Sequence, residues 1–163
     1  MKAPVSESLH STTSGEITLR VAAKEDLEFL FSLLRASLGP YVEQTYGPWK
    51  DEEQRTRFFA STDPATHRII ELDGRPVGCL AVRWLPDQVK LDRILLLPAH
   101  QNRGIGTHLV REVVAKAGVA GLPVRLRVFR VNPARRLFEC LGFVATGETE
   151  THVLMEHPVS PSW

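Results

Sequence analysis

An apolar strand, a glycine-containing bend and a helix follow one another directly in LLLPAHQNRGIGTHLV, residues 95–110. With Ile94, the leucines form a short apolar run that ends at Pro98, and the polar segment after it contains Gly104 and Gly106. Beyond the glycines, apolar residues recur at the spacing of a helix. A strand that runs into a helix through a short bend needs a sheet with helices packed on it, so this segment favours an α/β fold.

The bend, residues 98–104, is suited to bind an anion. The first N–H groups of a helix have no partner within the helix and carry a partial positive charge, and glycine lets a ligand approach the backbone. Together these features favour a phosphate group. Two common phosphate-binding patterns do not fit: GxGxxG would need glycine at position 109, which is leucine, and GxxxxGKS/T has no match. Protein-kinase signature motifs are also missing from the sequence.

Hydrophobic periodicity and turn residues predict the other elements. Asp73–Gly74 is a strong turn signal for a hairpin, and Gly39–Pro40 is expected to break the first helix. Asn132 is suited to cap the last helix and Gly142 to end it. The expected strands are 16–22, 67–72, 76–85, 88–97, 124–131 and two within 143–158 around Gly147; the expected helices are 24–38, a short piece near 41–46, 51–60, 105–117 and 132–141.

The order of these elements predicts a mixed α/β sheet. A strand–helix–strand crossover in the second half favours local parallel pairing, whereas the hairpins favour antiparallel pairing elsewhere. A chain of 163 residues favours a single domain. We expect a flexible polar tail over 1–15, one domain over 16–157 and a short tail over 158–163.

Composition and charge argue against several classes of partner. The 20 basic and 19 acidic side chains leave a net charge of +1, which does not favour nucleic acid or an anionic membrane. No apolar run approaches the length of a membrane span, and the first residues lack the apolar stretch of a signal peptide. Cys79 and Cys140 form no CxxC pair and are expected to be reduced thiols of a cytoplasmic protein. The six histidines lack metal-ligand spacing, so no metal is expected.

The segment LPAHQNRGIG resembles the acetyl-CoA-binding motif of the GNAT acyltransferase superfamily, which is Gln or Arg, two residues, Gly, one residue, and Gly or Ala. Gln101, Gly104 and Gly106 occupy its fixed positions. NPARRLFECLGF, residues 132–143, is similar to the family's second landmark, and the order of elements resembles the family from about residue 16 to 157. The resemblance implies a mixed, mostly antiparallel, splayed central sheet flanked by helices.

This resemblance implies an acetyl-CoA-dependent N-acetyltransferase, one of the acyltransferases that transfer groups other than aminoacyl groups. The acetyl group would pass to a primary amine of a small molecule, peptide or protein by direct attack in a ternary complex. The family's pattern places the CoA pyrophosphate on the backbone amides from Asn102 to Gly106 or Thr107. It places the pantetheine arm along the backbone of Leu95–Leu97, as an added strand.

The resemblance also assigns roles around the reactive end of the cofactor. Asn132 would lie near the thioester, and Arg135 or Arg136 could contact the 3′-phosphate. His100 and His108 flank the bend. Each could contact the CoA phosphates, or each could be an ordinary surface or core histidine. The cofactor-binding residues implied are Leu95, Leu96, Leu97, Gln101, Asn102, Arg103, Gly104, Ile105, Gly106, Thr107, Asn132, Arg135 and Phe138.

A base is useful because the attacking amine must be neutral, whereas amines of this kind are largely protonated at neutral pH. Asp92 is the candidate base, since it lies on the strand before the bend, where many family members carry an acidic residue that acts through water. The alternative is an exposed strand carboxylate paired with Lys90 or Arg93. Glu71, Glu43 and the run Asp51–Glu53 compete with it, and the run is better interpreted as the first turn of a helix.

The general acid departs from the family pattern. The family's usual acid is the tyrosine of LYE, but this sequence has LFE, and Phe138 carries no hydroxyl. Tyr41 and Tyr46 could substitute as the acid, or they could form the acceptor wall or pack in the core. Trp49 could line a ligand pocket or pack in the core. The alternative function is a catalytically silent CoA-binding module. The expected partners are acetyl-CoA, an amine acceptor and a second copy of the chain in a homodimer.

Overall fold

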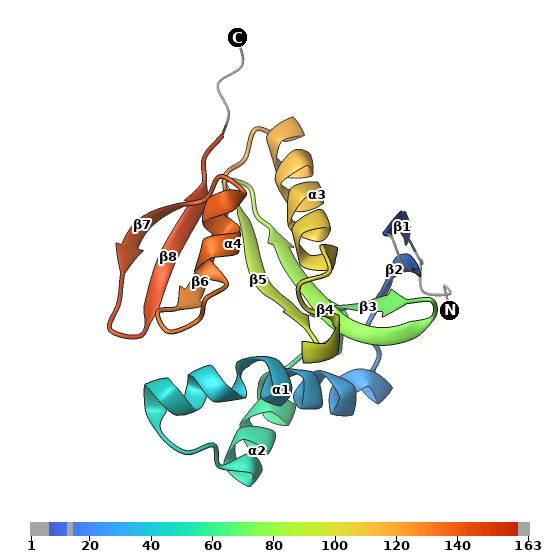
Figure 1. Ribbon diagram of the computed structural model, residues 1–163, viewed down its shortest axis with the longest axis vertical. Helices are drawn as coiled ribbons and strands as arrows, with labels where there is room; N and C mark the ends of the chain where they lie inside the picture. Colours follow the sequence, from blue (N-terminus) through green and yellow to red (C-terminus); the bar gives the residue numbers. More distant parts are fainter. Residues whose placement is uncertain (1–6, 13–14, 160–163) are drawn as a thin grey trace. The chain divides into compact units, whose positions relative to one another are not determined.

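The computed structural model describes residues 7–12 and 15–159 of the chain. The chain forms two compact units: residues 1–81 with 93–105, here the first unit, and residues 82–92 with 106–163, the second unit. The described strands follow the order β1-β2-β3-β4-β5-β6-β8-β7, and β4 and β5 each contribute to both units. All strand pairs but one are antiparallel among those whose register is resolved, which confirms the predicted mixed, mostly antiparallel sheet with helices (Figure 1).

The first unit places two helices against antiparallel strands. Its hairpin turn is the one predicted, because Asp73 and Gly74 have φ angles of 51° and 79°, as a two-residue type I′ turn requires. Helices and sheet share one core of Leu30, Phe31, Leu33, Phe58, Ile69, Cys79 and Leu95. The elements are β1 (Glu7–Thr12), β2 (Gly15–Val21), α1 (Leu27–Tyr46), α2 (Asp51–Ser61), β3 (Arg68–Leu72), part of β4 (Arg75–Trp84) and part of β5 (Val89–Leu96).

The sequence predicted that the first helix breaks at Gly39–Pro40. The structure shows instead that α1 continues through this dipeptide to Tyr46. A proline inside a helix costs about 3 kcal/mol, because it removes one hydrogen bond and crowds the preceding turn. The helical turns after Pro40 are stabilised by Trp49, which follows the helix. Its backbone N–H donates to Glu43 Oε1 at 3.2 Å, and its ring packs on Phe31. The α1–α2 connection thereby stabilises the helix that the proline weakens.

Two further boundaries differ from expectation. Residues 7–12, expected to be part of a flexible tail, form β1 and pair with β2, whereas residues 1–6, 13–14 and 160–163 lie outside the described residues. Backbone pairing requires no apolar alternation, so ESLHST carried no strand signal. The last two strands turn after Glu148 rather than at Gly147, which lies at a register shift within a strand. Glycine marks bulges as well as turns.

The second unit contains the predicted parallel crossover. Strand β5 pairs in parallel with β6 through Val89–Val124 and Lys90–Arg125, and no further β5–β6 pair is formed by the described residues. The remaining strand pairs of this unit are antiparallel. Within the described ranges, no helix combines the length and apolar character that crossing a bilayer requires. The elements are α3 (Ile105–Val119), β6 (Val124–Phe129), α4 (Arg135–Cys140), β7 (Val144–Glu148) and β8 (His152–His157).

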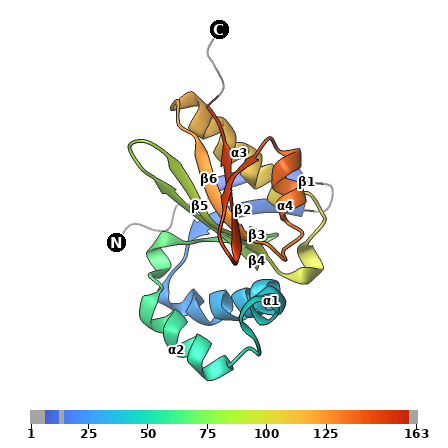
Figure 2. The same ribbon diagram turned by 90° about the vertical axis from the view of Figure 1, so that its left-hand side faces the viewer.

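Helix α4 has the ends that the sequence predicted. The side-chain Oδ1 of Asn132 accepts a hydrogen bond from the Ala134 N–H at 2.9 Å, and Gly142 has a φ of 96° just past the helix. Phe138 of α4 is buried and packs on Phe143, which packs in turn on His157 of β8. Figures 1 and 2 both show α4 beside β6 and β8.

Candidate functional site

Strand β5, the bend and helix α3 follow one another as the sequence predicted, and the side chain of Gln101 ties the bend to the end of β5. Gln101 Nε2 donates to the carbonyl oxygen of Leu96 at 3.0 Å, and Ser37 Oγ of α1 donates to the same oxygen at 2.8 Å. A carbonyl oxygen has two lone pairs, so this acceptor is saturated. Gln101 therefore fixes the bend itself.

The backbone of the bend is open. Asn102 and Gly104 have φ angles of 60° and 84°, and a Cβ built on Gly104 would meet no atom within 4 Å. In the part of the chain that the structure describes, the amides of these two residues donate no main-chain hydrogen bond of ordinary geometry. Helix α3 begins at Ile105, and the N–H groups of its first turn add further unpaired donors. This arrangement can hold a diphosphate.

The end of β5 approaches β4 closely. Leu97 N–H donates to the Val77 carbonyl at 2.8 Å, and a Cβ on Gly78 would lie 2.3 Å from the Leu95 oxygen, so only glycine fits there. Backbone groups of successive strand residues point to opposite edges. Leu95 and Leu97 therefore direct these groups toward β4, whereas the N–H of Leu96 points to the other edge. Of the three residues expected to pair with pantetheine, Leu96 offers the free donor on that edge.

Asp92 is paired, but with neither of the two partners that the sequence suggested. Arg83 of β4 donates through Nε to Asp92 Oδ2 at 2.5 Å and through Nη2 to Oδ1 at 2.9 Å. Lys90 and Arg93 form no ion pair with this carboxylate within the described part of the chain, and Arg83 of the neighbouring strand is the partner instead. Both carboxylate oxygens accept from Arg83, so a water or an amine that used Asp92 would have to share the carboxylate with this guanidinium.

The competing carboxylates each have a structural partner. Glu71 lies 3.4 Å from Arg20 Nε, and Glu43 accepts from the Trp49 backbone. Asp51 Oδ1 accepts from Trp49 Nε1 and from Arg35 Nη1, each at 3.0 Å, and these bonds lower the pKa of Asp51. A carboxylate with a lowered pKa is a weaker base. Asp51 also begins α2, as predicted for the acidic run.

The aromatic candidates divide between surface and core. Tyr46 ends α1 and is 64% exposed, whereas Tyr41 is half-buried. Trp49 is partly buried, and its ring packs at the edge of the core with its centroid 6.2 Å from that of Phe31. Phe138 is 6% exposed and lies in the apolar interior of the second unit. A hydroxyl at position 138 would therefore enter apolar surroundings.

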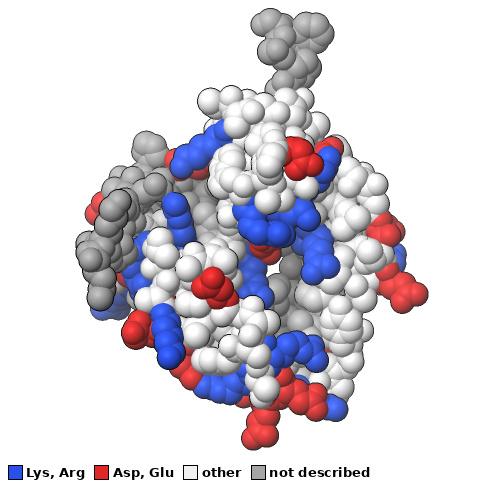
Figure 3. Space-filling view, turned by 180° about the vertical axis from the view of Figure 1, so that it is seen from behind, with Lys and Arg blue, Asp and Glu red and all other residues white. Residues whose placement is uncertain are grey.

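The remaining basic candidates are partly occupied. Arg135 Nε donates to Glu139 Oε1 at 2.7 Å, one helical turn away. His108 Nε2 lies 3.5 Å from Glu112 Oε1, also one turn away. The Nδ1 atom of His100, just before the bend, is buried and has no hydrogen-bond partner among the described residues. The face drawn in Figure 3 carries charges of both signs, so individual contacts rather than a surface of one sign locate the site.

Sequence reasoning missed Ser37 and Arg83. Ser37 is 59 residues from the carbonyl that it contacts, and no local pattern reports such a contact. Arg83 could have been found, because opposite charges at positions 83 and 92 flank a tight connection between two strands.

Comparisons with known proteins show the family and the fold. The profile of the Acetyltransferase (GNAT) family matches residues 28–143, more than half of the chain. No curated protein sequence is significantly similar to the chain. The PaiA N-acetyltransferase of Thermoplasma acidophilum, solved with coenzyme A, has a similar fold (TM-score 0.68, 21% identity, 87% of this chain and 98% of that chain covered).

Two more solved structures share the fold. The acetyltransferase of Thermus thermophilus gives a TM-score of 0.67 at 21% identity, covering 88% of this chain and 97% of that chain. The ribosomal-protein-S18-alanine N-acetyltransferase of Escherichia coli gives a TM-score of 0.63 at 19% identity, covering 90% of this chain and 96% of that chain. With the family profile over most of the chain and the same fold throughout, this chain belongs to the GNAT acetyltransferase family.

Proposed function

We propose that this protein transfers the acetyl group of acetyl-CoA to a primary amine of a small molecule or of a peptide or protein. The observation that carries the proposal is the bend, where Gln101 fixes the backbone and unpaired amides surround the open position of Gly104. Family membership and the coenzyme A complex of the Thermoplasma neighbour support the same cofactor. The CoA pyrophosphate would lie on the amides of residues 102–107, with Arg103, Ile105 and Thr107 supplying backbone contacts.

In the proposed reaction, the amine nitrogen bonds to the thioester carbonyl carbon, the carbon–sulfur bond breaks, and the proton lost by the amine finally reaches the departing thiolate. The N–H of Leu96 is proposed to stabilise the oxyanion. Asp92 would accept the amine proton through water, and Tyr41 or Tyr46 would supply a proton to the sulfur. We place Asn132, Arg135 and Phe138 beside the cofactor.

Two measurements test this function in sequence. Calorimetry should give acetyl-CoA binding in the micromolar range, about −7 to −8 kcal/mol, and absence of binding at millimolar cofactor would contradict the proposal. Release of free thiol from acetyl-CoA should then exceed hydrolysis for at least one amine of a library that includes peptide N-termini. The name of the Escherichia coli neighbour describes acetylation of a protein alanine, so peptide amines belong in that library.

A catalytically silent CoA-binding module is the second candidate. The bidentate Arg83–Asp92 pair and the buried Phe138 favour it, because Asp92 is shared with a guanidinium and Phe138 has no hydroxyl. Binding of acetyl-CoA without thiol release for any amine would support this module.

We also propose that the protein acts in the cytoplasm as a homodimer. Light scattering tests the dimer: a mass of 18.2 kDa at all micromolar concentrations would show a monomer.

A further inference from the structure

One face of the sheet in the second unit is charged. At the start of β5 and along β6, buried apolar residues alternate with Lys90, Asp92, Arg125 and Arg127. Successive strand residues point to opposite faces, and Lys90 pairs with Arg125 across the two strands, so the four side chains share one face. Lys90 is half-buried and the other three are exposed, so a ligand can approach them from solvent.

Two of the arginines on this face have a carboxylate. Arg83, at the end of β4, donates to both oxygens of Asp92. Arg125 Nε donates to Glu156 Oε1 at 2.8 Å, and Glu156 lies directly across β6 and β8 from it. Each of these carboxylates is therefore already balanced by a guanidinium.

Lys90 and Arg127 are not balanced in this way. Within residues 7–12 and 15–159, no carboxylate lies within ion-pair distance of either cation. Burial and the charge of Arg127 lower the pKa of His152 on β8, as expected where no anion offsets that charge. Four cations and two carboxylates leave two positive charges in excess on this face. A partly buried cation also attracts an added anion more strongly than a cation in bulk water does.

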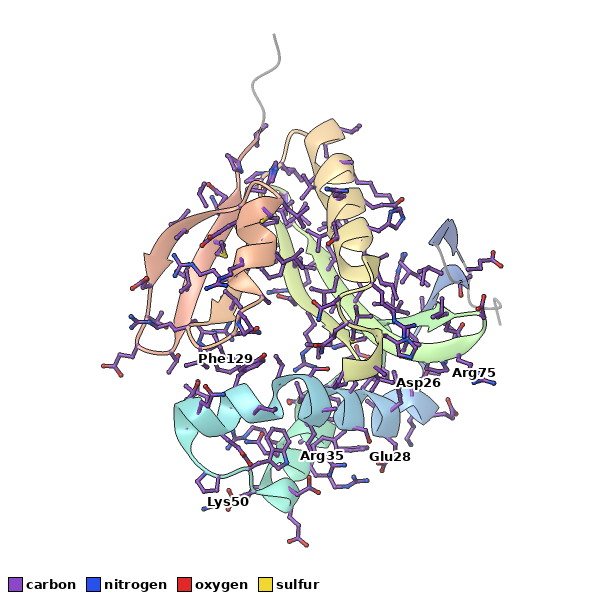
Figure 4. All side chains as sticks on the ribbon, in the orientation of Figure 1. Asp26, Glu28, Arg35, Lys50, Arg75 and Phe129 are labelled. Atoms are coloured by element: carbon purple, nitrogen blue, oxygen red, sulfur yellow. The ribbon has the colours of Figure 1, made fainter. Side chains whose placement is uncertain are left out.

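The place where β5 and β6 separate connects this face with the proposed chemistry. In the described part of the chain, Lys90–Arg125 is the last β5–β6 pair. Asp92 and Arg127 each lie two residues beyond it, so they flank the separation from its two sides. An acceptor amine that reaches Asp92, the proposed base, therefore brings its other groups close to Arg127. Phe129, labelled in Figure 4, follows at the end of β6.

A phosphate monoester suits two unbalanced cations better than a carboxylate does. It carries a charge of about −1.5 to −2 at pH 7 and three strong acceptor oxygens. Lysine supplies a compact charge and arginine a planar fork, and both bind phosphate oxygens. Adjacent strands lie about 4.8 Å apart and two residues span about 6.6 Å, so the Cα atoms of Lys90 and Arg127 are roughly 8 Å or more apart. Two long side chains can converge on one phosphate across this distance.

We propose that Lys90 and Arg127 bind a phosphate group of the acceptor, so that this protein acetylates small amines that carry a phosphate monoester. This inference rests on the proposed acetyl transfer. The amine nitrogen attacks the thioester as described above, and the phosphate takes no part in bond making. Lys90 and Arg127 therefore determine acceptor specificity. Because Asp92 and Arg127 belong to neighbouring strands, only a few bonds should separate the amine from the phosphate.

The test compares matched amines with acetyl-CoA at neutral pH: O-phosphoethanolamine against ethanolamine, and glucosamine 6-phosphate against glucosamine. The wild-type protein should prefer the phosphorylated member of at least one pair by at least tenfold in kcat/KM. Lys90→Gln and Arg127→Gln should each lower kcat/KM for that acceptor at least fivefold more than for its partner, mainly through KM. Ratios between variants cancel the intrinsic reactivity of each amine.

A second pair of amines tests the charge of the bound group. Taurine and 2-aminoethylphosphonate have the same shape, but the sulfonate carries one negative charge and the phosphonate carries nearly two. The wild-type protein should prefer the phosphonate at least fivefold in kcat/KM, and Arg127→Gln should reduce this preference. Equal use of the two compounds would overturn the assignment of a phosphate.

Lys116→Gln is the matched control, because it removes one exposed positive charge from the same unit but lies on α3. It should keep the preference for the phosphorylated amine. Equal losses for both members of a pair in Lys90→Gln and Arg127→Gln, or no preference in the wild type, would overturn the proposal.

Failure of the proposed function can be told apart from failure of this inference. If acetyl-CoA binds but no amine is acetylated, the proposed function fails. Ligand-observed proton NMR of O-phosphoethanolamine with the CoA-saturated protein then decides the subsite, because CoA already occupies the bend. Binding that is lost in Arg127→Gln supports the subsite, and absence of binding to the wild type refutes it.

Discussion

The bend after β5 and the α1–α2 region hold their functional candidates in different ways. In the bend, Gln101 contacts a carbonyl only five residues earlier in the chain. In the α1–α2 region, the pairs Arg35–Asp51 and Arg55–Glu28 join residues 16 and 27 positions apart, and Ser37 contacts β5 across 59 positions. Local contacts preserve a motif that can be recognised in sequence, whereas distant contacts leave no such pattern. Changes in the bend should therefore affect the cofactor, and changes around α1 and α2 should affect the acceptor or stability.

The largest expected effect is that of Gly104→Val on cofactor binding. The φ of 84° costs a branched residue about 1–2 kcal/mol, and the side chain would fill the space where the phosphates are proposed to lie. We expect the Kd for acetyl-CoA to rise at least about tenfold. Gly74→Val is the control, since Gly74 has a φ of 79° and equally open surroundings but lies in the β3–β4 turn. Equal weakening by both changes would mean that backbone strain, rather than the phosphate cradle, is responsible.

Asp92→Asn should lower kcat by about tenfold, less than the 10²–10⁴-fold typical of a well-placed general base. The reason is that Arg83 already engages both carboxylate oxygens, so the water that Asp92 would activate must share them with the guanidinium. Steady-state rates with the best acceptor measure the effect, with Arg83→Gln as the companion variant that frees the carboxylate. A loss above a hundredfold would show that the pair opens in the reacting complex, and no loss would remove Asp92 from the mechanism.

Gln101→Ala should raise the Kd for acetyl-CoA about fivefold. The change removes one neutral hydrogen bond, usually a contribution of about 0.5–1.5 kcal/mol, and loosens the bend. Ser37→Ala removes the other donor to the same carbonyl but leaves the bend in place, so its effect should stay below about twofold. Calorimetry on both variants measures the Kd for acetyl-CoA. A larger increase for Ser37→Ala than for Gln101→Ala would contradict the role given to Gln101.

Phe138→Tyr should change kcat by less than about tenfold. The CoA thiol, with a pKa near that of free cysteine, can leave as thiolate near neutral pH, so a restored acid would help little. The buried hydroxyl should lower the free energy of unfolding by about 1–3 kcal/mol, because Phe138 lies in apolar surroundings. Rates and thermal melts measure both effects. A hundredfold gain would show that the natural protein lacks a needed acid and would favour the silent module.

The smallest effect on function is expected for Asp26→Asn, at the start of α1. Hydrogen bonds from Arg20 and from the Ala23 backbone lower the pKa of Asp26. The carboxylate therefore stabilises the folded state above its unfolded pKa of about 3.9, and this stability is lost as pH falls through the lower folded pKa. The variant should lose about 1–2 kcal/mol at pH 7 and show a flatter acid limb in unfolding experiments. Unchanged stability at pH 7 would contradict this account.

The local elements of the fold could be predicted from the sequence because each has its signal nearby. Alternation identified the strands, Asp73–Gly74 identified the hairpin, and Asn132 and Gly142 identified the ends of α4. The prediction failed at Gly39–Pro40, where packing of Trp49 on Phe31 outweighs the cost of a proline inside α1. It also failed at β1, whose pairing depends on backbone groups that every sequence has.

The sequence by itself determined the strand, the bend and the helix start, and with them the positions of Gln101, Gly104 and Gly106. These depend on φ angles and on hydrogen bonds within a few residues. Only the tertiary structure decided which charges meet: Asp92 with Arg83 across a hairpin, and Arg93 with His67 rather than with a carboxylate. Strand register and helix packing set those distances, and two residues far apart in sequence carry no record of them until the sheet is formed.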